Sequence, residues 1–129
     1  VAATRLDDVS AATFHAAPHE IARLGYAVAH ELDPALAPVT ELTSESHILA
    51  ARIAEALKTA ERPLVVSGIG CGSKSVLAAA AQIAAALHRV GRAAGISLSV
   101  PACNTLGVGL IGGGSLEAAF KEVADEGNE

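Results

Sequence analysis

The residues from Gly68 to Ser75 are the part of the sequence whose types and spacing best suit the binding of a phosphate. They read Gly-Ile-Gly-Cys-Gly-Ser-Lys-Ser, and they lie between an apolar run that favours a strand and an Ala-rich run that favours a helix. A helix N-terminus offers free N–H groups and the positive end of a dipole, so it attracts phosphates. The candidate cofactor-binding residues are Gly68, Gly70, Gly72, Ser73 and Lys74, with Asn104 from a second loop expected on the opposite wall.

Two known nucleotide-binding motifs are matched only in part by this turn. In the P-loop pattern, Lys74 and Ser75 are present, but Ser73 replaces the second required glycine. In the dinucleotide fingerprint, Gly68 and Gly70 match, and Ser73 again replaces the third glycine. No Asp or Glu occurs between Arg62 and Leu116 to hold magnesium or a ribose, although the lack of acidic residues would suit an anion. The sequence therefore favours glycines that let the helix and the strand approach closely, with at most a vestigial nucleotide site.

Other reactive side chains do not form a recognisable catalytic or metal-binding pattern. Cys71 and Cys103 are the only cysteines, too few for a disulfide scaffold and too far apart in the sequence for a zinc or iron–sulfur site. Their apolar surroundings predict buried or half-buried thiols. His15 and His19 lie four residues apart without a third ligand nearby, so we expect solvated polar positions. Ser67 is not part of a nucleophile elbow. We predict no catalytic residue and no metal ligand.

The composition excludes several classes of protein. The chain has 129 residues, of which 51% are hydrophobic and 18% are charged, so it is not a disordered tail. A net charge of -5 and only three aromatic residues argue against nucleic acid as a partner. No apolar run approaches the ~20 residues of a membrane span, so direct membrane insertion is not expected. Because the chain starts at Val1 and lacks Met, we interpret residues 1–129 as one domain cut from a longer subunit.

The elements that would position the glycine turn follow from hydrophobic periodicity and from helix and strand boundaries. Strands are predicted at 1–6, 64–67 and 96–100, and helices at 18–32, 43–60, 73–89 and 116–124. Residues 33–40 are expected as a linker and residues 101–114 as a small-residue loop, with Ser115 as the N-cap of the last helix. The apolar run 64–67 predicts a strand that is buried on both faces. The strand–helix–strand order predicts a parallel sheet, and we expect an α/β, three-layer Rossmann-like domain.

The chain resembles a known family over nearly its whole length. The segments 64–73, 80–87 and above all 104–117, which reads Asn-Thr-Leu-Gly-Val-Gly-Leu-Ile-Gly-Gly-Gly-Ser-Leu-Glu, are similar to the large G subunit of bacterial NADH-quinone oxidoreductase, respiratory complex I. Residues 5–9 and 14–25 fit the same region. That subunit is in turn similar to molybdopterin-dependent oxidoreductases, and the resemblance implies a Rossmann-like domain that kept the fold and lost the pterin cofactor.

The resemblance implies a structural domain in the electron-input arm that passes electrons from NADH to quinone. It implies that the isolated chain is inactive and binds no cofactor, with iron–sulfur clusters elsewhere in the parent subunit. It also implies that the partners are other subunits of complex I, and that the location is cytoplasmic and peripheral to the inner membrane. Two alternatives remain: a dinucleotide-binding module, and the central domain of a thiamine-diphosphate enzyme, which matches residues 60–87 but not 104–115.

Overall fold

The protein is described by a computed structural model that covers residues 5–126, with the side chains of residues 106 and 126 excepted. The chain forms two units, Val1–Ser99 and Val100–Glu129. The first contains α1 (Pro18–Leu32), α2 (Ser44–Thr59), β1 (Leu64–Gly68), α3 (Lys74–Arg89) and β2 (Gly95–Ser99). The second contains α4 (Thr105–Ile111) and α5 (Leu116–Glu126). Each unit is described by itself.

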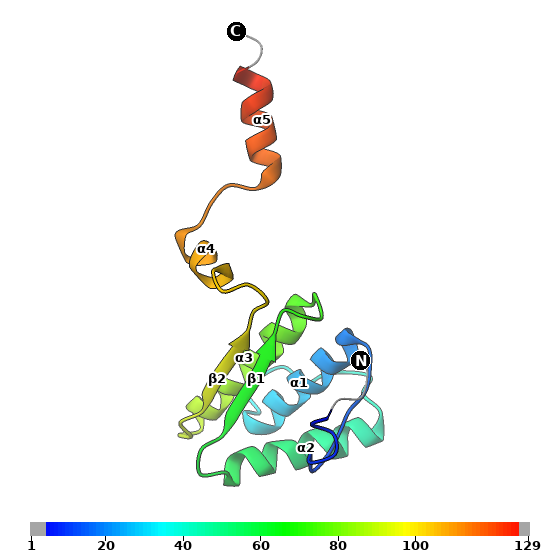
Figure 1. Cartoon of the computed structure of the whole chain (residues 1–129). Coiled ribbons are helices and arrows are strands. Elements are labelled where there is room, and N and C mark those ends of the chain that lie inside the picture. Colours follow the sequence, from blue (N-terminus) through cyan, green and yellow to red (C-terminus); the bar gives the residue numbers. More distant parts are fainter. Residues whose placement is uncertain (1–4, 127–129) are drawn as a thin grey trace. The chain divides into compact units, whose positions relative to one another are not determined.

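The sheet of the first unit consists of β1 and β2, which run parallel and side by side (Figure 1). Leu64 pairs with Gly95 at one end and Gly68 with Ser99 at the other. Beyond the last pair, the Ile69 N–H donates a hydrogen bond of 3.3 Å to the Ser99 carbonyl. The predicted α/β class and the parallel strand–helix–strand unit are therefore confirmed, because α3 connects the two strands.

The helix boundaries follow from local chemistry. Pro18 begins α1, where its missing N–H costs nothing. The hydroxyl of Thr43 accepts a hydrogen bond from the Ser46 N–H and caps α2. The Ser73 hydroxyl accepts from the Val76 N–H in the same way and caps α3. The predicted bounds of these three helices agree with the observed bounds to within one residue.

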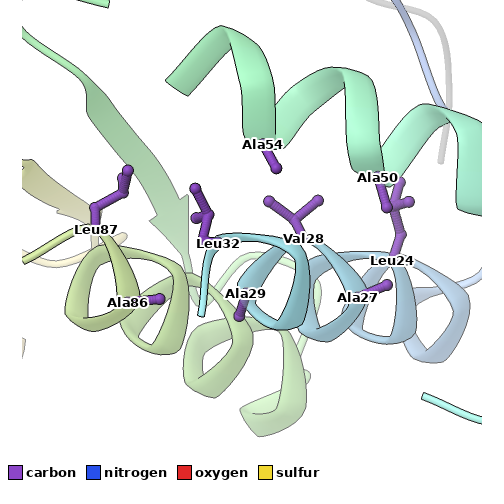
Figure 2. Close-up of a cluster of buried hydrophobic side chains, with 9 residues drawn as sticks. All are labelled: Leu24, Ala27, Val28, Ala29, Leu32, Ala50, Ala54, Ala86 and Leu87. Carbon is purple, nitrogen blue, oxygen red and sulfur yellow. The ribbon is translucent and has the colours of Figure 1, made fainter. Parts of the chain in front are cut away.

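The hydrophobic core lies among the three helices of the first unit (Figure 2). Val28 and Leu32 of α1 point toward Ala54 on α2, and Ala86 and Leu87 come from α3. Leu32, Leu87 and Val28 are the largest fully buried side chains. Many of the other core positions are alanines, so the helix backbones can approach closely: a Cβ added to Gly25 on α1 would lie 2.9 Å from the Ala79 Cβ on α3.

Within the first unit, one face of the sheet has no cover from the described residues. α1 and α3 lie on one side of the sheet (Figure 1), and Val65 packs toward the core. Successive side chains of a strand point to opposite faces. Leu64 and Val66 therefore share the other face, and their side chains are 59% and 66% exposed. The prediction that 64–67 is buried on both faces is wrong for this structure, and the expected three layers are not seen in the described part of the first unit.

The N-terminal prediction also fails where it can be compared. The strand expected at 1–6 falls partly on residues 1–4, which lie outside the described residues. Residues 5–9 form turns, in which the Val9 N–H donates to the Leu6 carbonyl and the Ser10 hydroxyl donates to the Asp7 carbonyl. These local hydrogen bonds compete with extended pairing, and residues 5 and 6, the described part of the predicted strand, lie in the turn.

The second unit contains one helix that was predicted and one that was not. The hydroxyl of Ser115 accepts from the Ala118 N–H at 3.1 Å, so its role as the N-cap of α5 is confirmed. α4 lies inside the segment predicted as a loop. α5 carries Leu116, Phe120 and Val123 at helical spacing, and these side chains are 66–71% exposed. Within this unit, the apolar stripe of α5 has no buried partner among the described residues.

Candidate functional site

The glycine turn joins the carboxyl end of β1 to the N-terminus of α3. The Gly72 N–H donates a hydrogen bond of 2.9 Å to the Ile69 carbonyl and closes a turn around Gly70 and Cys71. Gly72 then adopts φ +64°, in the left-handed region that residues with a side chain rarely occupy. This conformation turns the chain from the direction of β1 into α3. The turn is therefore fixed at the N-terminus of α3.

The three glycines of the turn have different structural roles. A Cβ at Gly68 would lie 2.8 Å from the Ser99 carbonyl oxygen, so a side chain there would push the two strands apart. Gly72 is needed for its positive φ, and a Cβ there would meet nothing within 4 Å. Gly70 shows neither constraint. The close contact at Gly68 is thus between the two strands and not between helix and strand as expected, while Gly72 supports the turn through its backbone conformation.

Ser73 and Lys74 begin the helix that follows the turn. The Ser73 hydroxyl already accepts from the Val76 N–H at 3.4 Å, so it serves the helix cap. Lys74 is the first residue of α3, and its side chain is exposed. The first N–H groups of any helix lack intrahelical acceptors. The arrangement therefore has the chemistry to attract an anion through backbone N–H groups and one ammonium group.

The fit to a complete nucleotide cofactor is poor. The second motif glycine of a P-loop would let the backbone wrap the phosphates, and here its place is taken by the capping residue Ser73. No carboxylate occurs between Arg62 and Leu116, so neither the ribose nor a magnesium ion has an acidic partner from this stretch. These residues suit an anion of no particular shape better than they suit a dinucleotide or a magnesium–triphosphate.

Asn104, the sixth candidate, belongs to the second unit. It is the N-cap residue of α4, its side chain makes no capping hydrogen bond, and its side chain is exposed. A Cβ added to Gly107 would lie 2.5 Å from the Asn104 Oδ1, so Gly107 leaves room for this amide. The expectation that Asn104 faces the glycine turn stays a prediction, as does the binding role of all six residues.

The remaining polar candidates are exposed, and the two histidines among them lie beside carboxylates. Cys71 and Cys103 are both exposed free thiols, so the prediction of buried or half-buried thiols is wrong. His15 Nε2 lies 3.3 Å from Asp7 Oδ2, and His19 Nε2 lies 3.3 Å from Glu20 Oε1. Within residues 5–126, no three His, Cys, Asp or Glu side chains gather as metal ligands. None of the helices in the described part of the chain is long and apolar enough to cross a membrane.

A groove of about 660 Å³ was not predicted from the sequence. It is lined by residues 11–14 and by one face of α2, including Phe14, Ile53 and Leu57. The Arg52 guanidinium donates to the Ala11 carbonyl at 2.8 Å and holds the N-terminal segment along α2. Residues 11–14 show no helix or strand periodicity, so no signal in the sequence placed them beside α2.

Comparison with known proteins gives several similar sequences that share one name. The G subunit of NADH-quinone oxidoreductase from Pseudomonas fluorescens is 48% identical over 125 residues, which cover 97% of this chain and 14% of that protein. The corresponding protein from Pseudomonas putida is 46% identical over 123 residues, and that from Escherichia coli K12 is 42% identical over 120 residues. The chain is homologous to a segment of the G subunit of NADH-quinone oxidoreductase. No protein-family model matches it.

The resemblance to the G subunit inferred from the motifs is therefore confirmed. The chain spans only about 14% of the length of the G subunits that it matches. In these relatives, the glycine turn and the Asn104 segment are thus part of a much longer protein. The activity of that complete protein is therefore not assigned to this chain by the similarity alone.

Proposed function

We propose that this chain is a structural domain of a G subunit in the arm of NADH-quinone oxidoreductase that passes electrons from NADH to quinone. The observation that carries the proposal is the 42–48% identity to G subunits over at least 93% of the chain. The same relatives favour this function and not the alternative, the central domain of a thiamine-diphosphate enzyme. Other subunits of that complex would be the partners, and the location would be cytoplasmic, peripheral to the inner membrane.

We further propose that the domain itself is not catalytic and holds no cofactor. Two of the three glycines of the turn have backbone roles, since Gly68 lies against Ser99 and Gly72 has a positive φ. The Ser73 hydroxyl is used as a helix cap. The chain has two cysteines, whereas common iron–sulfur clusters take four cysteine ligands. The clusters of the electron path would accordingly be held by other parts of the longer protein.

A direct test is NADH-dependent reduction of ferricyanide by the purified chain, with an intact NADH-quinone oxidoreductase as the positive control. The proposal predicts no rate above that of buffer for the chain and rapid reduction for the control. Turnover by the chain that survives repurification would overturn the non-catalytic assignment.

The fold of the complete domain is proposed to have three layers. Leu64 and Val66 are more than half exposed on the sheet face opposite α1 and α3. Burial of apolar surface contributes roughly 25 cal/mol per Å², so a bare sheet face is unfavourable in water. A further helical layer from the longer protein would cover this face and give the Rossmann-like arrangement.

Thiol labelling distinguishes an open from a covered face. Val66→Cys would be made in a background with Cys71→Ser and Cys103→Ser, because both native thiols are exposed. Labelling would be read by mass spectrometry of the peptide that contains position 66, which separates it from cysteines elsewhere in the full-length protein. We expect fast maleimide labelling at position 66 in the isolated chain and at least tenfold slower labelling in the full-length protein. Unfolding the full-length protein in urea should restore labelling, which controls for loss of the thiol. Equal rates in the chain and in the folded full-length protein would contradict the proposed layer.

Nucleotide binding at the glycine turn is the second candidate function. It is favoured by the exposed Lys74 at the first position of α3 and by the lack of carboxylates from Arg62 to Leu116. Calorimetric titration with ADP, GDP and NAD at low salt tests it. Dissociation constants below roughly 100 μM, equivalent to more than about 5.5 kcal/mol, would show a specific site. Weaker binding that modest salt abolishes would show only an unspecific anion site, which is the result we expect.

A further inference from the structure

We draw no further inference here: the strongest candidate, the apolar groove that residues 11–14 form with α2 around Phe14, Ile53 and Leu57, carries none because nothing in the structure shows what covers it.

Discussion

The backbone role assigned to Gly72 makes a quantitative prediction. Its φ of +64° is left-handed, and a Cβ there would meet nothing within 4 Å, so a side chain would be penalised only for backbone conformation. This penalty is roughly 1–2 kcal/mol for an ordinary residue and larger for a β-branched residue. We expect Gly72→Val to lower the free energy of unfolding by about 1–3 kcal/mol.

A series of substitutions separates backbone strain from packing. Asn tolerates the left-handed region better than Ala, and Ala better than Val. The expected order of destabilisation is therefore Val, then Ala, then Asn at position 72. Gly70→Val is the matched control, because Gly70 lies in the same turn without a positive φ and without a neighbour within 4 Å. It should change the free energy of unfolding by less than about 0.5 kcal/mol.

Urea unfolding followed by far-UV circular dichroism measures these differences, because α1, α2 and α3 dominate the helical signal of the first unit. For a unit of this size, 1 kcal/mol corresponds to a shift of roughly 4–8 °C in Tm, so thermal unfolding gives a second readout. Equal losses for Gly72→Val and Gly70→Val, or an Asn variant as unstable as the Val variant, would refute the argument from φ.

Three further substitutions test the packing and a non-glycine residue with a positive φ, with the same unfolding measurements. Gly25→Val should cost about 1–3 kcal/mol, since even a Cβ there would lie 2.9 Å from Ala79 Cβ, and an unchanged stability would show that α1 and α3 can separate freely. Leu87→Ala should cost about 2–5 kcal/mol because Leu87 is fully buried, whereas a loss under 1 kcal/mol would contradict its place in the core. Glu41→Gly should stabilise the chain by ~0.5 kcal/mol because Glu41 has φ +61°, and a clear destabilisation would show that its side chain outweighs the backbone strain.

The helices of the first unit were predictable because their apolar residues repeat at helical spacing and their ends carry strong signals. Pro18 at the first turn of α1 and Ser73 at the N-cap of α3 are such signals, and both appear in the structure. The two strands were predictable because each is a short run rich in β-branched residues. The helix between the two runs is long enough to connect parallel strands.

The burial of β1 could not be predicted in the same way. A continuous apolar run such as Leu64–Val66 looks the same whether both faces are covered or only one, because the cover comes from distant parts of the chain. α4 was missed because Gly107 and Gly109 each weaken a helix by about 1 kcal/mol and favoured a loop. The exposure of Cys71 was missed because apolar neighbours in the sequence do not show whether a turn residue is covered in the fold.

The candidate site was predictable as a position but not as a function. The sequence placed the glycine turn between β1 and α3, and the structure confirms this place. Glycine is required at position 68 by the nearby Ser99 carbonyl and at position 72 by a positive φ. Neither feature can be read from the local sequence. Glycines required for backbone geometry and glycines that bind phosphate look the same in the sequence, so the function of the turn could not be predicted from it.

The most direct measurement of the central claim uses the G subunit from Escherichia coli, which matches this chain over 120 residues. The matching segment would be replaced by this chain in one strain and deleted in another, and NADH-quinone reductase activity and the amount of assembled complex would be measured in membranes. We predict that the chimaera assembles and keeps most of its activity, whereas the deletion loses the complex. A deletion that leaves assembly and activity unchanged, or a stably expressed chimaera that cannot assemble, would contradict the account.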